Sequence, residues 1–373
     1  MRIAIHAADL DSGRIDGTRI YISSVLKRLG SLSPGDEFLI YHKGNFNPSL
    51  APPQLGNYKF RRLWKIPFWT QTAFAISLWW DDPDALWMPA TNLPVFRRKR
   101  MRTVVTVHDL AYRYFPDHFP KKDLCKLKLF AGLATACADG IISVSESTGR
   151  DILKFHKKAS KDRIKVVHHG FDAGLFKKGI SQNESEEVLS KFKIQNSKFI
   201  LYVGAIQPRK NLSVLVEAFE KIKPAHPEMK LVLAGEKAWM WEEDVSRIEK
   251  SPFAGDIVLA GKVGFEKLPA LYGNAAVFVF PSLYEGFGIP ILEAFACGVP
   301  VVAADNSSLP EVGGDAALYF DAASADDLKN RLEEILSDED LSAELSRKGL
   351  ERAEEFSWEN CAKRTFDYIK DAI

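Results

Sequence analysis

Short, fully apolar runs alternate with longer segments of mixed polarity along the whole chain. In the longer segments apolar side chains recur at helical spacing, as at Ile20, Val25, Leu26 and Leu29. Continuous apolar runs are typical of strands buried on both faces, which occur in parallel sheets covered by helices. The alternation therefore predicts an α/β fold built on parallel sheets. The clearest runs are EFLIYHK (37–43), RTVVTVHDL (102–110), FILYVG (199–204), KLVLAGE (230–236), AAVFVF (275–280) and PVVAAD (300–305).

The length of the chain and one polar segment predict two domains. A chain of 373 residues is longer than a single hydrophobic core usually holds. Residues 179–187, GISQNESEE, are polar and have no apolar period, so we interpret them as a connector.

The composition is that of a soluble globular protein, with 46% hydrophobic and 27% charged residues. No apolar run reaches the ~20 residues of a membrane helix, and the first residues lack the features of a signal peptide. We therefore expect a cytoplasmic protein. No C-x-x-C pair is present, so we expect buried free thiols and neither disulfides nor zinc at Cys125, Cys137, Cys297 and Cys361.

The charge is unevenly distributed along the chain. Residues 1–180 contain 29 Lys/Arg and 16 Asp/Glu, a net of +13, whereas residues 181–373 contain 21 and 33, a net of −12. A basic half suggests an anionic partner such as a membrane surface, a lipid phosphate or a nucleic acid. The alternative is that the uneven distribution of surface charge has no function. No recognisable nucleic-acid module is present, so we expect no nucleic-acid partner.

Aromatic and basic residues are mixed in one stretch of this basic half. Residues 58–80, YKFRRLWKIPFWTQTAFAISLWW, contain Arg61, Arg62 and Lys65, and a second basic cluster follows at residues 97–100. Such a stretch suits a membrane interface, with rings at headgroup depth and bases on lipid phosphates. A core helix with a few surface bases has the same pattern, and we favour it slightly.

The most informative stretch is residues 281–311, PSLYEGFGIPILEAFACGVPVVAADNSSLPE. After a predicted strand it has a turn with Gly286 and Gly288, then a predicted helix with Pro290 in its first turn. Glycines allow a ligand close to the backbone, and the N–H groups of a helix start favour an anion. Glu285 and Glu293 flank this turn, eight positions apart. A solvated loop acid and an acid near a helix start would have the same spacing, so the spacing leaves both interpretations open.

Three motifs together resemble the retaining glycosyltransferases of family 4. They are EGFGIPILE, with its E-x7-E spacing, VGAIQPRKN (203–211) and TVHDLAYRYFPDHFP (106–120). The resemblance implies the GT-B fold: α/β, with two Rossmann-like domains whose parallel sheets face a central cleft. It implies an N-terminal acceptor-binding domain over 1–175, a nucleotide-sugar-binding domain over 176–354, and a last helix, 355–373, that crosses back to the N-terminal domain.

The resemblance also implies site residues. His108 and Glu285 are the expected catalytic residues, with His108 contacting the sugar. Without the resemblance, a structural histidine bonded to Asp109 is the simpler interpretation of His108. One departure is that Ala205 stands where many relatives have arginine. The expected donor-binding residues are Gly17, Arg209 and Lys210 for the phosphates, Lys262 and Val263 for the nucleobase, Glu285, Gly286, Phe287, Gly288 and Ile289 for the sugar, and Glu293 for the ribose.

The substrates are inferred from the same resemblance. HDLAYRYFPDHFP is similar to the mannosyltransferases that build bacterial surface polysaccharides, so we expect GDP-mannose as donor, with a UDP-sugar as the alternative. We expect a saccharide or polyprenyl-diphosphate-linked acceptor and a peripheral contact with anionic membrane through the basic N-terminal domain. The sequence has no D-x-D motif at a strand end that would argue for a bound metal ion, so we expect no metal or other cofactor. A nucleotide-sugar epimerase of the same fold and a non-catalytic binding protein are the competing classes.

Overall fold

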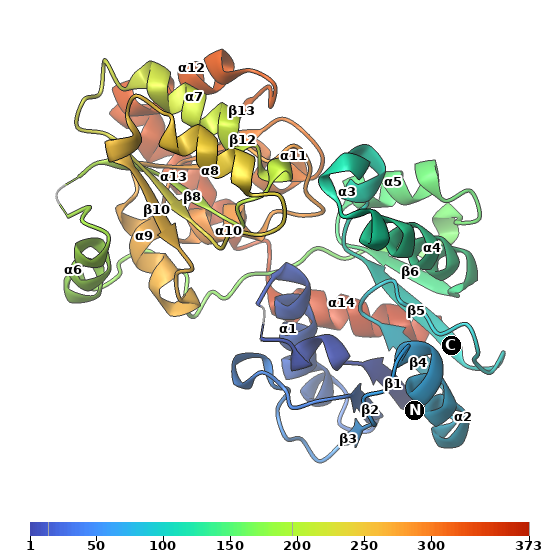
Figure 1. The fold of residues 1–373 in the computed structure, drawn as a ribbon. Coiled ribbons are helices and arrows are strands. Elements are labelled where there is room, and N and C mark those ends of the chain that lie inside the picture. Colours follow the sequence, from blue (N-terminus) through green and yellow to red (C-terminus); the bar gives the residue numbers. More distant parts are fainter. Residues whose placement is uncertain (14, 196, 373) are drawn as a thin grey trace. The chain divides into compact units, whose positions relative to one another are not determined.

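The computed structural model describes residues 1–13, 15–195 and 197–372. The chain forms two compact units (Figure 1). The N-terminal unit contains Met1–Tyr114, Pro120–Gly170 and Trp358–Ile373, and the C-terminal unit contains Phe115–Phe119 and Phe171–Ser357.

The N-terminal unit is built on a parallel sheet with strand order β3-β2-β1-β4-β5-β6-β7. The strand order runs one way from β1 to β3 and the other way from β4 to β7. The direction therefore reverses between β1 and β4, which is where doubly wound sheets bind ligands. The strands are β1 (Arg2–His6), β2 (Glu37–His42), β3 (Tyr58–Arg62), β4 (Ala85–Met88), β5 (Arg102–Val107), β6 (Gly140–Ser143) and β7 (Ile164–Val166).

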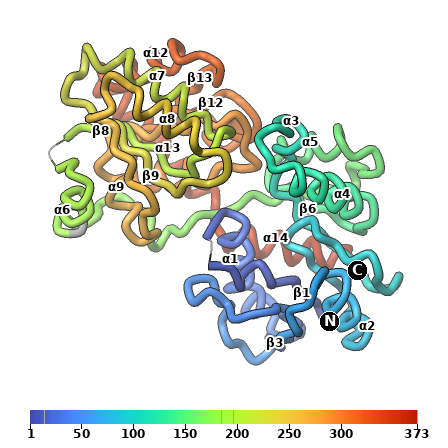
Figure 2. Tube along the Cα trace, viewed as in Figure 1, coloured from blue at the N-terminus to red at the C-terminus, as the bar shows by residue number. Residues whose placement is uncertain are grey.

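The helices of this unit include one from the far end of the chain, α14, whose red trace runs among the blue elements in Figure 2. Arg28 of α1 forms an ion pair with Glu359 of α14 at 2.6 Å, and Tyr368 donates a hydrogen bond to the Arg163 carbonyl. The helices are α1 (Gly17–Leu32), α2 (Ala75–Asp81), α3 (Ala111–Tyr114), α4 (Lys121–Cys137), α5 (Glu146–Phe155) and α14 (Trp358–Asp371).

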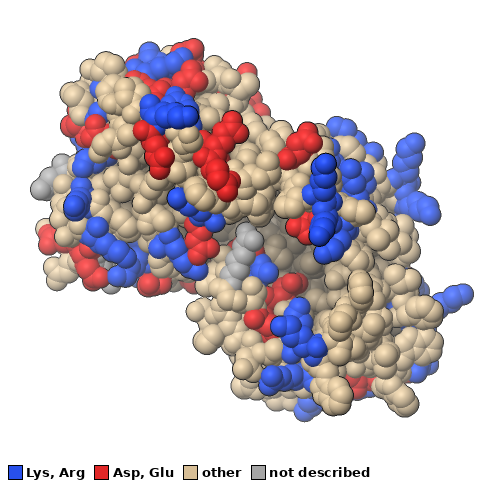
Figure 3. All heavy atoms as spheres, viewed as in Figure 1, with Lys and Arg blue, Asp and Glu red and all other residues tan. Residues whose placement is uncertain are grey.

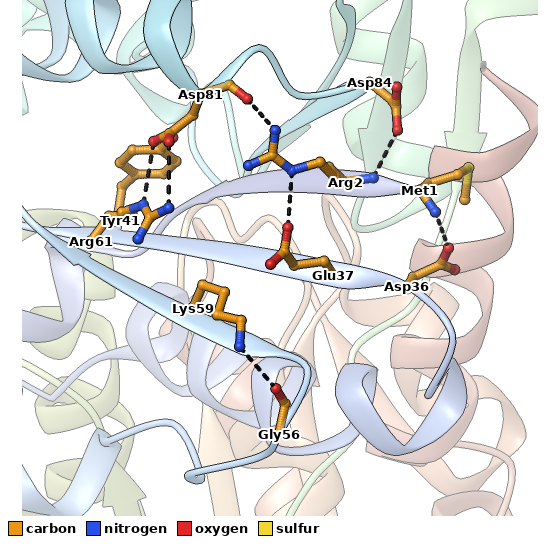
Figure 4. Close-up of polar contacts among 10 residues, drawn as sticks. All are labelled: Met1, Arg2, Asp36, Glu37, Tyr41, Gly56, Lys59, Arg61, Asp81 and Asp84. Carbon is orange, nitrogen blue, oxygen red and sulfur yellow. Dashed lines mark hydrogen bonds and ion pairs between the residues drawn. The ribbon is translucent and has the colours of Figure 1, made fainter.

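Polar contacts join β1, β2, β3 and α2 to one another (Figure 4). Arg2 of β1 donates to Glu37 of β2 at 2.9 Å, and its main-chain N–H donates to Asp84 before β4 at 2.7 Å. Asp81 at the end of α2 accepts a hydrogen bond from Tyr41 at 2.5 Å and pairs with Arg61 of the edge strand at 3.4 Å. These contacts fix α2 against the sheet.

The C-terminal unit repeats the same architecture, with parallel strand order β10-β9-β8-β11-β12-β13. Its order reverses between β8 and β11. The strands are β8 (Phe199–Val203), β9 (Lys230–Ala234), β10 (Ile257–Gly261), β11 (Val277–Phe280), β12 (Val301–Ala304) and β13 (Ala317–Phe320). The helices are α6 (Gln182–Lys191), α7 (Leu212–Ile222), α8 (Glu242–Glu249), α9 (Leu268–Asn274), α10 (Ile289–Ala296), α11 (Leu309–Gly313), α12 (Ala325–Ser337) and α13 (Glu339–Ala353).

The central strands of both sheets are buried, as the apolar runs predict. All four residues of β11, VFVF, are buried, and β12 pairs with it in the register Phe278↔Val301. The loop after β8 lies so close to the loop after β9 that a Cβ on Gly235 would lie 1.7 Å from the Gly204 carbonyl oxygen. Only glycine fits at position 235, so the close approach of these two loops depends on that glycine.

The predicted fold class is confirmed for both halves of the chain: each is a doubly wound parallel sheet of the Rossmann type. In the described part of the chain, no helix is long and apolar enough to cross a membrane.

Several local expectations differ from the structure. Most of the expected connector, residues 179–187, lies in helix α6, which starts at Gln182. Cys125 and Cys137 are exposed on α4, while Cys297 and Cys361 are buried free thiols as expected. Phe115–Phe119, expected in the N-terminal domain, belongs to the C-terminal unit, where the Trp239 indole donates to the His118 carbonyl at 2.7 Å.

Candidate active site

Two loops meet at the point where the strand order of the C-terminal sheet reverses. One follows β8 and contains a 3₁₀ turn, Pro208–Lys210; the other follows β11 and leads into α10. The Leu283 N–H donates to the Arg209 carbonyl at 2.9 Å, and Asn211 donates to the Pro281 carbonyl at 3.1 Å. Because the carboxyl ends of neighbouring parallel strands lie at one edge of the sheet, both loops face the place where such sheets bind ligands.

Three charged side chains gather on these loops. Lys210 Nζ pairs with Glu285 Oε1, and Arg209 Nη1 lies 3.3 Å from Glu285 Oε2. The Arg209 guanidinium also donates to the Tyr284 carbonyl, and the Lys210 ammonium lies 5.2 Å from the centre of the Phe280 ring. Two cations thus share one carboxylate, and the group has a net charge of +1.

Glu285 is ionised at neutral pH. Burial alone would raise the pKa of its carboxyl group, but the nearby charges of Lys210 and Arg209 outweigh burial and lower the pKa to about 2. The carboxylate therefore holds both cations in place across the physiological pH range, and the remaining positive charge suits an anionic ligand such as a diphosphate.

The turn between Glu285 and α10 is held by its neighbours in the fold. Gly288 has φ +126°, a conformation that favours glycine, and a Cβ there would lie 3.2 Å from Leu309 Cδ2. Ser307 Oγ accepts from the Glu285 N–H at 3.0 Å, and Ser308 Oγ donates to the carbonyls of Glu285 and Phe287 at 2.9 and 2.6 Å. These bonds fix the shape of the turn before any ligand binds.

The side chains that follow the turn point into the protein. Phe287 is buried and its ring packs edge-on against Phe356 at 5.8 Å, and Ile289 is also buried. The backbone of these residues therefore offers more to a ligand than their side chains do. Helix α10 starts at Ile289, so Pro290 is its second residue and lies in the first turn, as predicted from the sequence.

Glu293 differs from Glu285 although the two are eight positions apart. It is buried in α10, where its Oε2 accepts a hydrogen bond from Tyr272 of α9 at 3.0 Å. Burial raises the pKa of Glu293 to about 7; the bond from Tyr272 opposes this rise and Asp172 adds to it. Among the described residues, the groups that shift the pKa of Glu293 include no cation. The E-x7-E spacing thus joins one permanently charged carboxylate and one that titrates near neutrality.

Lys262 and Val263 follow β10, two strands away from β8 in the sheet. Lys262 is exposed and pairs with Glu236 at 2.7 Å, and the Glu236 carbonyl accepts from the Ile206 N–H in the loop after β8 at 2.9 Å. Glu236 therefore links Lys262 to the loop after β8. Within the described part of the chain, no ion pair joins Lys262 to the cluster of Arg209, Lys210 and Glu285.

In the N-terminal unit, His108 lies at the carboxyl end of β5. Its Nε2 donates to the carbonyl of Pro89, which follows β4, at 2.8 Å. Asp109, considered above as its partner, instead accepts from the Ala111 N–H at 3.0 Å. Burial lowers the pKa of His108, so the ring is neutral with its proton on Nε2, and Nδ1 is left as a hydrogen-bond acceptor.

Aromatic rings surround His108. Tyr21 of α1 contacts it edge-on at 5.1 Å, and His169 lies 5.6 Å away and stacks on Tyr21 at 4.8 Å. Gly17 is the first residue of α1 and follows the N-cap Asp16, and Tyr21 lies one turn later in the same helix. Gly17 and His108 are therefore connected through α1.

Sequence comparisons identify both units. Residues 32–175 match the family described as Glycosyltransferase Family 4, and residues 184–352 match Glycosyl transferases group 1. The chain is 34% identical over 273 residues to an O-antigen chain mannosyltransferase B of Escherichia coli, covering 72% of this chain and 70% of that one. The chain belongs to glycosyltransferase family 4.

Another relative and two solved structures are also similar to this glycosyltransferase. A serotype-specific mannosyltransferase WbdA of Escherichia coli is 30% identical over 292 residues, which cover 76% of this chain and 34% of WbdA, about a third of its length. Among solved structures, Anabaena HepE in complex with UDP and glucose has a TM-score of 0.77 at 18% identity, covering 99% of both chains. WaaG, a glycosyltransferase involved in lipopolysaccharide biosynthesis, has a TM-score of 0.76 at 14% identity, covering 98% of this chain and 99% of that one. These likenesses show the GT-B fold.

The structure of this glycosyltransferase brings Arg209, Lys210 and Glu285 together, with the backbone of the following turn beside them. Sequence reasoning missed the residues that hold this site: Ser307 and Ser308 at the turn and Tyr272 at Glu293. Ser307 and Ser308 lie within residues 281–311, the most informative stretch of the sequence, so their place in that stretch could have pointed to them. Nothing in the sequence pointed to Tyr272. Among the described residues, no group of three His, Cys, Asp or Glu side chains is placed to hold a metal ion.

Proposed function

We propose that this glycosyltransferase transfers mannose from GDP-mannose to a hydroxyl group of a saccharide or lipid-linked saccharide, with retention of the anomeric configuration. The observation that carries the proposal is the cluster of Arg209, Lys210 and Glu285 where the strand order of the C-terminal sheet reverses. The choice of mannose is supported by the names of the two Escherichia coli relatives, both mannosyltransferases.

The first task of the site is to bind a nucleoside diphosphate and stabilise it as it leaves. When the bond between the sugar C1 and the diphosphate oxygen breaks, negative charge develops on that oxygen. Arg209, Lys210 and the first N–H groups of α10 supply positive charge that is already in place, so little reorganisation is needed. We expect this charge to replace a metal ion.

Glu285 has two parts in this account. Its carboxylate fixes the positions of both cations, and each of its oxygens has a further lone pair that can accept a hydrogen bond from a sugar hydroxyl. Glu293 would accept hydrogen bonds from the ribose hydroxyls, for which its charged form is the stronger acceptor.

His108 is proposed to contact the transferred sugar. A neutral imidazole with its proton on Nε2 can accept a hydrogen bond at Nδ1 from a sugar hydroxyl, and the bond to the Pro89 carbonyl fixes the orientation of the ring. The role is that of a positioning contact, and no covalent sugar intermediate on His108 is proposed.

The test is a transfer assay with radiolabelled GDP-mannose, UDP-glucose, UDP-galactose and UDP-N-acetylglucosamine, each with a mannose-terminated oligosaccharide and a chelator. We expect labelled product from GDP-mannose alone, with an α-linkage in its NMR spectrum. Transfer from a UDP-sugar would keep the reaction class and replace the donor. Isomerisation of a donor without an acceptor would mean that the protein is an epimerase.

A further inference from the structure

Exposed aromatic side chains gather in one part of the N-terminal unit. Trp64, Phe68, Trp80 and Phe96 are 87, 80, 85 and 75% exposed. In the described part of the chain no other Phe or Trp exceeds the 45% of Trp79. Single exposed hydrophobic residues are common on protein surfaces, but a group of large rings indicates a surface that is covered in use.

Hydrogen bonds join the segments that carry Phe68, Trp80 and Phe96. Thr72 Oγ1 donates to the Pro67 carbonyl at 3.2 Å, which ties the loop after β3 to the turn Thr70–Phe74 that precedes α2. The Gln71 side chain bridges this turn to the loop after β4, because it donates to the Leu93 carbonyl at 3.0 Å and accepts from the Val95 N–H at 2.9 Å. Phe68, α2 and Phe96 therefore belong to one local structure.

The helix α2 presents an apolar face to solvent. Ile76, Trp79 and Trp80 lie at positions i, i+3 and i+4, on one side of the helix, and all are exposed. We call the following seven exposed apolar residues of this region the aromatic patch: Trp64, Phe68, Ile76, Trp79, Trp80, Val95 and Phe96.

The opposite side of the same segment belongs to the core. Trp69, Phe74 and Leu78 are buried, and the Trp69 and Phe74 rings stack at 5.4 Å. Residues 58–80 are therefore not a single core helix, which was the favoured interpretation, because they form a strand, a loop and a helix of which only one side is buried. The aromatic patch lies outside this core, so its residues can be replaced without opening the core.

Positive charge borders the aromatic patch. Residues 58–102 contain nine Lys/Arg and three Asp. The acids are already engaged: Asp81 pairs with Arg61 (Figure 4), Asp82 pairs with Arg98 at 3.0 Å and with Arg100, and Asp84 accepts from the Arg2 N–H.

Three exposed bases of this border, Arg62, Lys65 and Lys99, have no ion pair within residues 1–13, 15–195 and 197–372. In Figure 3 the surface in the region of α2 is largely uncharged, with basic groups projecting near it. The surface thus combines exposed rings with available positive charge.

We propose that the aromatic patch docks on a lipid bilayer that contains anionic lipids. The Trp and Phe rings enter the headgroup region, and Arg62, Lys65 and Lys99 approach the lipid phosphates. A second copy of the chain suits the surface less well, because in a two-fold dimer each patch meets itself and the basic borders face one another. The proposal goes beyond the transfer reaction and does not depend on the identity of the donor.

The experiment measures binding of the full chain to vesicles of phosphatidylcholine with and without phosphatidylglycerol, at low and high salt. We expect binding to require the anionic lipid and to weaken with salt. The triple variant Phe68→Ser/Trp80→Ser/Phe96→Ser should bind at least about tenfold more weakly, since each ring loses apolar burial. Lys65→Gln/Lys99→Gln should bind vesicles about 25-fold more weakly, at about fivefold for each base near the surface.

Matched controls lie on α4 of the same unit, where Leu129→Ser removes an exposed apolar side chain and Lys121→Gln/Lys122→Gln removes two exposed bases. These variants should bind vesicles like the unaltered protein. Lipids brominated near the headgroup should quench tryptophan fluorescence, and Trp80→Phe should remove a large part of the quenching. Thermal melting shows that each variant is folded.

Two results would overturn the proposal. One is that the unaltered protein does not bind anionic vesicles at low salt, or that the triple aromatic variant and the double lysine variant bind them as tightly as the unaltered protein does. The other is that the triple variant dissociates a dimer in sedimentation while vesicle binding is absent, which would make the aromatic patch an interface between copies. Neither readout involves sugar transfer, so failure of this proposal is separate from failure of the proposed function.

Discussion

The two sheets have the same type of strand order but different chemistry at their carboxyl ends. In the C-terminal unit three charged side chains share a largely buried site: Arg209, Lys210 and Glu285. In the N-terminal unit the corresponding edge holds rings, among them Tyr21, His108 and His169. Burial lowers the pKa of both histidines, so this cluster is neutral.

This difference suggests that the two units bind different parts of the substrates. A charged, preorganised site suits a diphosphate, whereas a neutral cluster with one oriented acceptor nitrogen suits uncharged sugar hydroxyls. If the division holds, changes in the C-terminal unit alter nucleotide binding, and changes in the N-terminal unit alter transfer and leave nucleotide binding intact. The predictions below test that separation.

Replacing Lys210 should have the largest effect. Lys210→Ala removes a cation and leaves the Glu285 carboxylate with Arg209 as its remaining close partner, so the diphosphate meets less positive charge. We expect kcat/KM for transfer to fall about 1000-fold, equivalent to ~4 kcal/mol. Lys221→Ala, which removes a lysine paired with Asp326 on the surface, is the matched control and should change little. A loss below about tenfold for Lys210→Ala would show that Lys210 does not carry the diphosphate.

Protonation of Glu293 should make stability depend on pH. Its pKa is about 7 in the folded protein, above the ordinary value of 4.5, because the group is buried. The folded state therefore binds the proton more tightly, and this contribution is fully present below pH 4.5 and is lost as pH rises through 7. The loss amounts to ~3 kcal/mol of unfolding free energy.

Denaturant unfolding at pH values between 5 and 8 tests this prediction. Glu293→Gln should remove this component of the pH dependence, and Glu217→Gln, at an exposed position of α7, should keep it. The Glu285 contribution does not overlap this window. Its pKa is lowered to about 2, so its stabilisation is present above pH 4.5 and is lost as pH falls through 2. An unchanged profile in Glu293→Gln would assign the pH dependence to other groups.

His108 should matter for transfer and not for nucleotide binding. We expect His108→Ala to lower kcat for transfer about 100-fold, because the sugar loses an oriented contact. The Kd of the nucleoside diphosphate should stay within about twofold, since the cations are untouched. His226→Ala in the C-terminal unit serves as the control. A large rise in the Kd for His108→Ala would break the separation between the two units.

Replacing Glu285 should change the affinity for the nucleoside diphosphate by the smallest amount, and in a direction specific to its charge. Glu285→Gln removes the negative charge that competes with a diphosphate for Arg209 and Lys210. We expect the nucleoside diphosphate to bind about fivefold more tightly, equivalent to ~1 kcal/mol, while transfer is weakened. Weaker binding instead would mean that holding the cations in position is the more important role of the carboxylate. Thermal melting checks that the variant is folded.

Much of the site could be predicted from the sequence because it depends on local patterns. The run VFVF, the turn with Gly286 and Gly288 and the helix that follows are each encoded within a few residues. Parallel strands place their carboxyl ends at one edge of the sheet, which explains why the cations after β8 lie beside Glu285 after β11. The fold class followed from the same alternation.

Other features depend on packing between distant segments and left no signal in the sequence. The bond from Tyr272 to Glu293 joins α9 to α10, and the bond from His108 to Pro89 joins the ends of β5 and β4. Helix α6 was interpreted as a connector because Val188 and Leu189 are its only apolar residues, which is too few to show a period. The exposure of the aromatic patch was also undecided, because a buried and an exposed amphipathic face have the same spacing.

Calorimetric titration tests most directly whether the C-terminal unit binds the diphosphate: GDP, with UDP in parallel, is titrated into the unaltered protein, His108→Ala and Lys210→Ala in the presence of a chelator. We expect one nucleotide to bind without metal, His108→Ala to bind it as tightly as the unaltered protein, and Lys210→Ala to bind it at least about tenfold more weakly. Equal losses in both variants, or full binding by Lys210→Ala, would contradict the assignment of the diphosphate to the C-terminal unit.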